Sequence, residues 1–456
     1  MLKILLFLML AAFLFPVTGY ASVNLELDSP SVILVEQSTG RILYSRDERA
    51  RKYPASLTKM LTALISVEYL DLEQEIIVGQ EIRNMPPGFA SNIHYEGETI
   101  NVEMLLRAML IRSSNETGRV LALNIVRQQE DQRDIQFSQA ERIFSNMMNE
   151  KARSLGAVGT NFNNPFGSHS ENHFTTAYDM AIITKAFMSN PILAEIAGTR
   201  TYEGWTNTNQ MLPNAPHGHP YIIGAKAGFT TPAGHSFAAA AEFGDVKLIS
   251  VVMGGTETGR WQDTRRLMDY GFFNFTFHEI SQQGQFLETK EVENPRLGES
   301  PDIEIISSES HFAFISHAEY ATLERTITLD PSFYTETEIL DEYGNAETVI
   351  KLLAPIEYGA EIGFATYSAG GFVFLQTPVL AGRAVYERNL DSDMDYYFSM
   401  FLRIFSRPAL PYWFGVFGIA FGFLGIIIAI KTSRKAGRNA GWVYEKHSKN
   451  RYSRYR

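Results

Sequence analysis

A serine and a lysine stand three residues apart at the start of a strongly apolar segment, Pro54 to Leu64. Pro54 suits the first turn of a helix, where its missing N–H has no partner to lose. Apolar side chains then recur at helical spacing, at Leu57, Met60, Leu61 and Leu64. We therefore predict a buried helix on which Ser56 and Lys59 share one face, and the rest of the fold must cover it.

The two side chains, a hydroxyl and an amine, are of the types that act as a nucleophile and its base. A serine hydroxyl is a weak nucleophile unless a neighbouring group takes its proton, and a lysine amine takes it when burial and nearby cations favour the neutral form. The helix N-terminus adds a positive dipole end beside the reacting oxygen. Because Ser-x-x-Lys also occurs by chance in many helices, the rest of the chain must decide its meaning.

Both ends of the chain carry apolar segments. Residues 1–21 hold Lys3, an apolar run and small residues at the end, so we predict a cleaved secretory signal, with a retained N-terminal anchor as the alternative. Residues 412–430 are uncharged, have no polar face and are about as long as a bilayer-spanning helix requires. We predict one C-terminal transmembrane helix there.

The charges around this segment predict its orientation. Residues 431–456 are rich in lysine and arginine against the single acidic residue Glu445, so the positive-inside rule predicts a basic cytoplasmic tail. Everything between the signal and the span is then expected on the extracytoplasmic side of the cell membrane, held by a single pass. This exported part is acidic, which argues against nucleic acid as a partner.

The composition of the chain excludes several kinds of catalytic and structural site. The chain of 456 residues contains no cysteine, which excludes disulfides, thiol nucleophiles and thiolate metal sites. With 45% hydrophobic and 12% aromatic residues it is long enough for two or three domains with sizeable cores. An exported protein of this kind must be stabilised by core packing.

Two pairs of histidines are candidates for a metal site, and for each a simpler interpretation is preferred. His169 and His173 lie in a loop-like sequence without the His-Glu-x-x-His order, so we predict a surface loop. His217 and His219 lie between prolines, where a turn before a strand is the simpler account. No metal and no cofactor are expected.

Periodicity predicts an α+β arrangement followed by an all-β one. Strands are expected on both sides of a mainly helical insert, at 32–35, 42–44, 221–223, 236–243 and 246–253, with helices at 101–111 and 261–275. Such an order predicts an antiparallel sheet whose first and last strands are adjacent. After residue 285, short alternating segments separated by turns predict a small β domain.

Three separated clusters now stand together: Ser56 with Lys59, Ser113-Ser114-Asn115, and Lys226-Ala227-Gly228 on a predicted strand. They resemble the motif set of penicillin-binding proteins and β-lactamases. Further phrases, such as Val252-Met253-Gly254-Gly255, are similar to the D-alanyl-D-alanine carboxypeptidases, which are low-molecular-mass penicillin-binding proteins. The resemblance covers about residues 30–275.

The resemblance implies a role for each matched residue. Ser56 is the expected acyl-ester nucleophile, Lys59 the general base, and Ser113 a relay that carries a proton to the leaving amine. The residues expected to bind substrate are Asn115 for the amide, Lys226 for positive charge, Gly228 for close approach of the substrate backbone, and Arg260 for the terminal carboxylate. Backbone N–H groups of Ser56 and of His235 or a neighbour are the expected oxyanion donors.

The implied activity is serine acyl transfer on peptidoglycan stem peptides, with release of the terminal D-alanine and sensitivity to β-lactam antibiotics. The implied fold is a β-lactamase/penicillin-binding-protein transpeptidase-like domain, with an antiparallel sheet and a helical cluster. The expected division is a signal peptide at 1–21, a D,D-carboxypeptidase domain at 22–284, a β-rich domain at 285–388, a membrane-proximal connector at 389–411, a transmembrane helix at 412–430 and a cytoplasmic tail at 431–456.

One position departs from the family pattern. Ala227 stands where a hydroxyl residue usually helps to bind the substrate's carboxylate, and loss of such a bond costs about 1.5 to 3 kcal/mol. Thr230 and Thr231 are candidates to supply the hydroxyl. Two alternatives therefore stay open: a weak or inactive penicillin-binding or peptidoglycan-binding scaffold, and a β-lactamase, although the latter needs neither the β domain nor the anchor.

Overall fold

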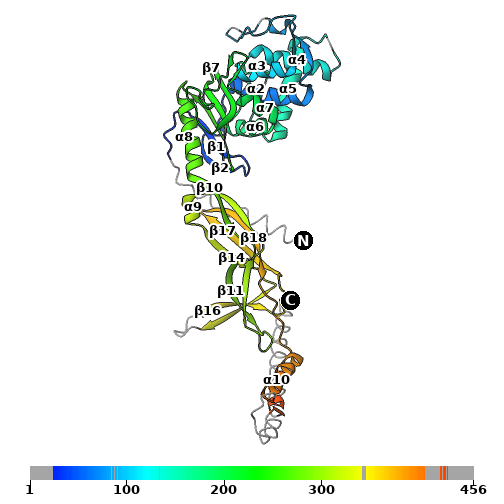
Figure 1. Ribbon diagram of the computed structural model, residues 1–456, viewed down its shortest axis with the longest axis vertical. Helices are drawn as coiled ribbons and strands as arrows, with labels where there is room; N and C mark the ends of the chain where they lie inside the picture. The colour runs from blue at the N-terminus through cyan, green and yellow to red at the C-terminus, as the bar shows by residue number, and fades with distance from the viewer. Residues whose placement is uncertain are drawn as a thin grey trace, which may run out of the picture. The chain divides into compact units, whose positions relative to one another are not determined.

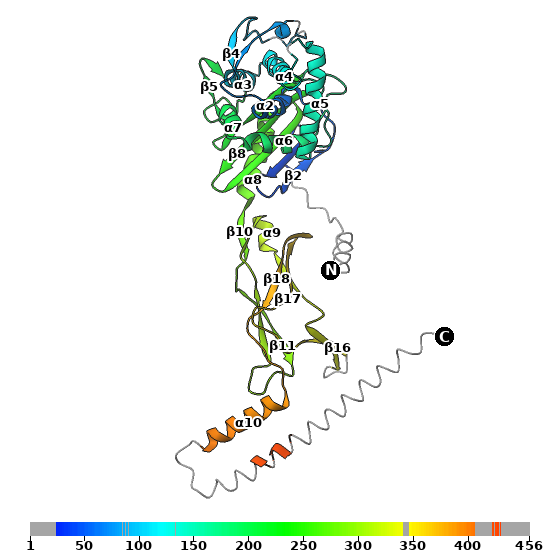
Figure 2. The same ribbon diagram turned by 90° about the vertical axis from the view of Figure 1, so that its right-hand side faces the viewer.

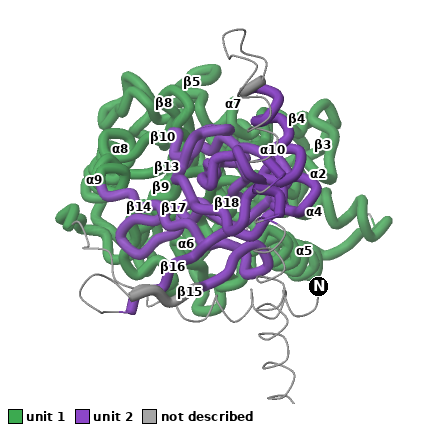
Figure 3. The backbone as a smooth tube through the Cα atoms, turned by 90° about the horizontal axis from the view of Figure 1, so that it is seen from below, with its two compact units in different colours: residues 1–278, 314–321 green, residues 279–313, 322–456 purple. Residues whose placement is uncertain are grey.

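The computed structural model describes residues 24–83, 85–86, 88–89, 91–132, 134–340 and 346–405, with a few more between 422 and 429. The chain forms two compact units, drawn in different colours in Figure 3. Unit 1 comprises the residues up to 278 together with 314–321, and unit 2 comprises 279–313 and the residues from 322 onward. The chain thus returns to unit 1 after it has first entered unit 2.

A five-stranded antiparallel sheet forms the centre of unit 1 (Figure 1). Its strands, in spatial order, are β2 (Ile42–Arg46), β1 (Ser31–Glu36), β9 (Val246–Gly255), β8 (Gly234–Phe243) and β7 (Ile222–Thr230). Ile33 of β1 is opposite Val251 of β9. The prediction that the first and last strands of the sheet are adjacent is therefore confirmed, although more than 200 residues separate them.

Helices cover the sheet on both faces, and the alternation along β8 shows why. Ala238 and Ala240 belong to the apolar core that holds α2, whereas Phe237 and Ala239 belong to the core that holds α8. The helices of the first core are α2 (Thr58–Tyr69), α3 (Val102–Ile111), α4 (Asn115–Gln129), α5 (Phe137–Leu155), α6 (Ala177–Ser189) and α7 (Pro191–Gly198). The helix of the second core is α8 (Gly259–Asn274).

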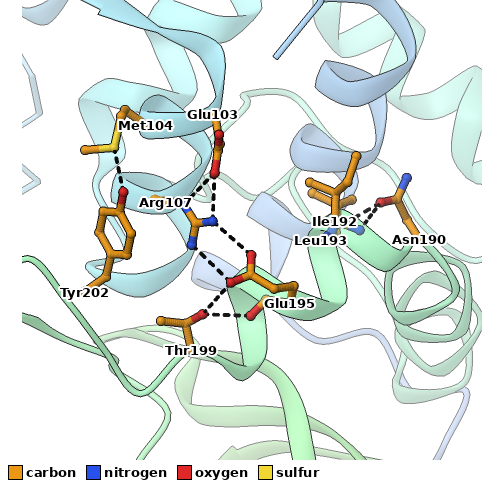
Figure 4. A network of polar contacts seen from close by, with 9 residues as sticks. All are labelled: Glu103, Met104, Arg107, Asn190, Ile192, Leu193, Glu195, Thr199 and Tyr202. Carbon is orange, nitrogen blue, oxygen red and sulfur yellow. Dashed lines mark hydrogen bonds and ion pairs between the residues drawn. The ribbon is translucent and has the colours of Figure 1, made fainter. Parts of the chain in front are cut away.

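Shorter elements connect these layers: the 3-10 helices η1 (Ala55–Leu57) and η2 (Gln80–Ile82), the hairpins β3 (Glu75–Ile77) with β4 (Thr99–Asn101) and β5 (Thr201–Tyr202) with β6 (Trp205–Thr206), and α9 (His317–Ala321). Figure 4 shows a polar network between α3 and α7. The Arg107 guanidinium donates to Glu103 on its own helix, at 2.7 Å, and to Glu195 of α7, at 3.0 Å. Asn190 caps α7 by accepting from the N–H groups of its first turn.

The residues of unit 2 that the structure describes up to 405 form strands and the helix α10 (Leu390–Phe405) (Figure 2). Its seven-stranded sheet has the order β14 (Glu324–Leu329), β17 (Glu361–Ala369), β18 (Phe372–Ala381), β12 (Asp302–Ser307), β11 (Phe286–Glu293), β16 (Ala346–Leu353) and β15 (Tyr334–Leu340). Strands β10 (Phe275–Ser281) and β13 (His311–Ser316) form a separate pair, and each of them has residues in both units. Helix α10 follows the seven-stranded sheet. The alternating segments at 303–305, 326–328 and 361–364 all lie in these strands, as their periodicity predicts.

The predicted membrane-related segments fall largely beyond these elements. The signal at 1–21, most of the span at 412–430 and the whole tail at 431–456 lie outside the described residues. Within the described residues no single helix is long and apolar enough to cross a membrane. Only α6 and α7 together pass that test, bent by 101°, and their apolar side chains Met180, Phe187 and Leu193 are buried in the core of unit 1.

Candidate active site

The predicted helix at Pro54 is present, with a tighter first turn than expected. Ser56 lies in η1, and α2 begins two residues later, so Ser56 and Lys59 face each other across the joint. Lys59 Nζ is 2.9 Å from Ser56 Oγ. The Lys59 side chain is completely buried, as a base that must stay neutral requires.

Two further oxygen atoms determine the orientation of the Lys59 amine. Its Nζ donates to Asn115 Oδ1 at 2.6 Å and to the carbonyl oxygen of Phe166 at 2.8 Å. Both partners can only accept, and a neutral amine has two N–H bonds and one lone pair. Once both N–H bonds are used in this way, the lone pair points toward the Ser56 hydroxyl.

The electrostatics of the site favour the neutral amine. Burial lowers the pKa of Lys59 well below its usual range, the positive charge of Lys226 lowers it further, and Glu116 opposes both. Lys226 is itself buried, and burial together with the nearby Arg260 lowers its pKa to about 7. The predicted role of a desolvated lysine with cationic neighbours therefore has a physical basis here.

The second motif lies between helices α3 and α4. Ser114 caps α4 by accepting from the Thr117 N–H. Asn115, the first residue of α4, donates its Nδ2 to the carbonyl oxygen of Phe89 at 2.8 Å, which turns Oδ1 toward Lys59. Ser113 precedes them in a left-handed conformation, with φ of 60°. Within the described part of the chain no hydrogen bond joins Ser113 to Ser56 or Lys59, so its relay role stays a prediction.

The third motif lies on β7, at the edge of the sheet. Lys226 Nζ donates to the Ala227 carbonyl oxygen at 3.0 Å and to Thr208 Oγ1 at 3.3 Å. A Cβ on Gly228 would lie 3.2 Å from the carbonyl oxygen of Pro54 and 3.2 Å from the Ser56 nitrogen. Glycine at 228 therefore lets the strand approach the backbone that carries the nucleophile. The close neighbour in this structure is the protein's own turn, where the sequence suggested a substrate backbone.

Arg260 brings a third cation to the same strand end. It lies at the start of α8, 9% exposed, and its Nη1 donates to the Gly228 carbonyl oxygen at 3.3 Å. Its guanidinium lies over the Trp261 ring, and its buried Nε has no hydrogen-bond partner among the described residues. Burial lowers the pKa of Arg260 to about 10, with Glu257 opposing. A guanidinium with unused donors suits a carboxylate ligand.

The residue that departs from the family pattern is packed in the core. Ala227 is buried opposite Phe237 of β8, in the cluster that also holds Trp261. Of the two candidate replacements, Thr230 accepts the Ala233 N–H through its hydroxyl at 3.3 Å, in the turn that follows β7. Thr231 is exposed in that turn.

The loop at residues 164–168, which the sequence interpretation did not assign to the site, contacts Lys59 and the backbone beside Ser56. Asn164 is buried, and its Oδ1 accepts the N–H groups of Phe166, Gly167 and Ser168, which folds the loop into a tight turn. This turn presents the Phe166 carbonyl to Lys59 and places Gly167 against the backbone of Ala55. The sequence Asn-Pro-Phe-Gly is a turn signal that could have located the loop, but not its neighbour.

The surface-loop prediction for His173 is wrong. The side chain is buried, and burial lowers its pKa to about 3, so it stays neutral. Its Nδ1 accepts the Asn163 N–H at 3.0 Å, which leaves Nε2–H to donate to Thr58 Oγ1 at 2.8 Å. A polar residue in this loop is buried because it ties the loop to the first turn of α2.

The two buried lysines should make stability depend on pH. Lys226 has a folded-state pKa of about 7, below its unfolded value, so the unfolded chain binds more protons between those values. The free energy of unfolding is expected to rise from pH 7 toward pH 10, by about 1.4 kcal/mol per pH unit for Lys226. Urea unfolding at pH 7, 8.5 and 10 should show a smaller rise for Lys226→Met than for the wild type. An equal rise in the two proteins would contradict the low pKa.

Comparison with known proteins agrees with this geometry. A family model described as D-alanyl-D-alanine carboxypeptidase matches residues 18–257. The carboxypeptidase DacF of Bacillus subtilis strain 168 is 27% identical over 379 residues, which cover 80% of this chain and 87% of that protein. DacC of Escherichia coli K12 is 25% identical over 396 residues, which cover 82% and 90%.

Solved structures share the fold. The D-alanyl-D-alanine carboxypeptidase DacD from Francisella tularensis has a TM-score of 0.60 at 20% identity and covers 81% of this chain and 96% of its own. Penicillin binding protein 5 from Haemophilus influenzae has a TM-score of 0.55 at 23% identity and covers 81% of this chain and 100% of its own.

The antiparallel sheet flanked by a helical cluster, the serine beside a buried lysine and the family match together define a serine peptidase of the penicillin-binding-protein class. The family model matches more than half of the sequence, and this match identifies the family. The chain belongs to the D-alanyl-D-alanine carboxypeptidases, the low-molecular-mass penicillin-binding proteins, and is a serine-type hydrolase. The resemblance inferred from the motifs is confirmed.

Proposed function

We propose that this protein is a membrane-anchored, penicillin-sensitive carboxypeptidase that removes the terminal D-alanine of peptidoglycan stem peptides through an acyl-enzyme on Ser56. The observation that carries the proposal is the buried Lys59, whose Nζ lies 2.9 Å from Ser56 Oγ and also donates to Asn115 Oδ1 and the Phe166 carbonyl oxygen. When the neutral amine uses its two N–H bonds for Asn115 and Phe166, its lone pair is left for the serine. The motif match and the curated relatives named carboxypeptidases support the substrate class.

The proposed reaction has two halves. Ser56 Oγ attacks the carbonyl carbon between the last two D-alanines while its proton passes to Lys59. The proton then reaches the leaving amine, with Ser113 as the proposed relay, and free D-alanine departs. Water attacks the carbonyl carbon of the resulting ester while Lys59 takes a proton from the water. The bond between that carbon and Ser56 Oγ breaks, the proton passes to Oγ, and the shortened peptide leaves as a carboxylate.

The substrate's terminal carboxylate is assigned to the positive end of the site. Arg260 and Lys226 are the buried cations near Gly228, and an anionic substrate group lowers the cost of keeping them charged. Asn115 is proposed to contact the substrate amide, because its side chain already bridges Lys59 and the Phe89 carbonyl. The β-lactam ring mimics the same acyl donor and is proposed to acylate the same serine.

The location on the extracytoplasmic face of the cell membrane rests on the signal-like segment, the apolar segment at 412–430 and the basic tail. Helix α10, just before that apolar segment, adds support. Its exposed side chains include Met394, Phe398 and Leu402, which water solvates poorly.

Fluorescent penicillin labelling tests the acyl-enzyme. Full-length protein in detergent is expected to take one label that survives denaturation, and Ser56→Ala is expected to take none. Ser66→Ala is the matched control, because Ser66 is a buried serine on α2 that bonds only to the Thr62 carbonyl within the described structure. Equal labelling of Ser56→Ala and wild type would refute the proposal.

Ala227 separates an active enzyme from a binding scaffold. Ala227→Thr adds the usual hydroxyl and is expected to raise kcat/KM for D-alanine release from a stem pentapeptide by about tenfold or more, the equivalent of 1.5 to 3 kcal/mol roughly. Ala227→Val has nearly the same shape without the hydroxyl and should give no gain. A wild type without measurable release and a threonine variant with clear release would favour the scaffold alternative.

A further inference from the structure

Glu116 is a buried carboxylate beside the site, and none of the roles described above uses it. It lies in the first turn of α4, directly after Asn115, and is 3% exposed. Its carboxylate accepts the backbone N–H of Ser91, the N–H of Asn92 at 2.9 Å and the hydroxyl of Ser114 at 3.2 Å. A buried carboxylate that accepts this many hydrogen bonds has a fixed position in the fold.

These bonds tie a neighbouring segment to the start of α4, and the segment in turn holds Asn115. The Asn115 N–H donates to Ser91 Oγ at 3.2 Å, and its side-chain Nδ2 donates to the Phe89 carbonyl at 2.8 Å. The Phe89 carbonyl can only accept, so it forces the amide nitrogen toward itself and the amide oxygen toward Lys59. The orientation of Asn115 therefore depends on the segment that Glu116 holds.

The charge of Glu116 acts on the same lysine. Burial raises the pKa of Glu116, but the N–H and O–H donors around it outweigh that effect and lower the pKa overall, so the group is ionised at neutral pH. Its negative charge raises the pKa of Lys59, against burial and against Lys226. Among the described groups that act on Lys59, it is the one that keeps this base from becoming too weak to accept the serine proton.

We propose that Glu116 is a positioning residue, which holds Ser91 and Asn92 beside Asn115, fixes the Asn115 amide in this way, and acts by its charge on Lys59. The inference rests on the proposed acylation of Ser56, with Lys59 as the base. Glu116 touches neither substrate nor the reacting atoms in this assignment. It acts through Asn115 and Lys59.

The charged groups around this pair come from four elements. Lys59 lies on α2, Lys226 faces it from β7, and Glu116 and Arg119 extend from α4. Glu141 of α5 is the other carboxylate that acts on Arg119. Glu141 makes no contact with Ser91 or Asn92 among the described bonds, so Glu141→Gln removes a nearby negative charge without touching the proposed device.

The test is the pH profile of penicillin acylation in the full-length protein. Glu116→Gln keeps an oxygen that can accept the two backbone N–H groups but removes the charge. Without that charge the neutral form of Lys59 persists to lower pH, so the acid limb is expected to move to lower pH. Because the base is then weaker, the plateau rate is expected to fall about tenfold.

The control and the second variant make the outcomes distinct. Glu141→Gln should leave the limb and the plateau as in wild type. Glu116→Ala also frees the segment, so its plateau should fall further than that of Glu116→Gln. If the Glu116→Gln limb stays in place while only the plateau changes, Glu116 has a merely structural role and the proposal fails. If wild type itself takes no label, the proposed acyl-enzyme fails instead.

Discussion

Lys59→Met is expected to slow labelling of Ser56 by fluorescent penicillin by about 10³-fold, within the range of roughly 10² to 10⁴ for loss of a general base. Methionine fills much of the same buried space but has no basic nitrogen to take the serine proton and no N–H bonds for Asn115 and Phe166. The rate constant for labelling, measured at several penicillin concentrations, is the direct readout. Circular dichroism of the variant shows whether it is folded.

Thr62→Val is the matched control for that change. Thr62 lies one turn further along α2, and its hydroxyl donates to the Pro165 carbonyl at 2.6 Å, one residue before the carbonyl that Lys59 uses. Valine removes this link between helix and loop and leaves the amine in place. We expect a loss of about 1 kcal/mol in stability and near-normal labelling. Rapid labelling of Lys59→Met, or slow labelling of Thr62→Val, would contradict the assignment of Lys59 as the base.

Gly167→Ala is expected to damage both the fold and the reaction. An added Cβ would overlap the carbonyl oxygen of Ala55 and lie 3.0 Å from the Ser56 nitrogen, so the turn that carries the nucleophile must move. A displacement of about 1 Å in a reacting group costs roughly 10²-fold in rate. We expect labelling to slow by about that factor and unfolding to become easier by about 2 to 5 kcal/mol.

A second glycine separates the two causes of that damage. Gly156 ends α5 with φ of 94°, close to the 92° of Gly167, but nothing lies within 4 Å of the place where its Cβ would stand. Gly156→Ala therefore carries the cost of a left-handed backbone alone, about 1 kcal/mol, with labelling unchanged. Thermal unfolding and labelling rates of the two variants, compared side by side, measure the steric part. Equal effects would show that contact with Ala55 does not position Ser56.

The parts of the site that sequence reasoning identified are those encoded by short local patterns. Ser56 and Lys59 were expected on the same side because they are at positions i and i+3, and the structure brings their side chains to 2.9 Å across the joint between η1 and α2. Strand alternation located the strand that carries Lys226, and the meeting of β1 with β9 followed from strands on both sides of a helical insert. Each of these inferences needed only spacing, composition and general rules of topology.

The parts that were missed depend on contacts between distant segments. Phe166 contributes only its carbonyl to Lys59, 107 residues away in the chain, and any residue has a carbonyl. His173 was predicted to be a surface residue because its partner, Thr58, is 115 positions away. The contact of Gly228 with the backbone at Ser56 was likewise not foreseen, and the room it was expected to make for a substrate stays a prediction. Residue type alone does not show which distant residue a buried polar atom bonds to, or which backbone lies against a glycine.

The return of residues 314–321 to unit 1 has a practical consequence for anyone who shortens this protein. Phe314 belongs to the apolar core that holds α8, where its ring stacks on Phe275, and the Arg41 side chain donates to its carbonyl. A chain cut at residue 284 keeps every motif of the catalytic site but loses this segment, which leaves a gap in the core and Arg41 without that acceptor. A shortened peptidase that is meant to be soluble and stable should therefore extend at least to residue 321.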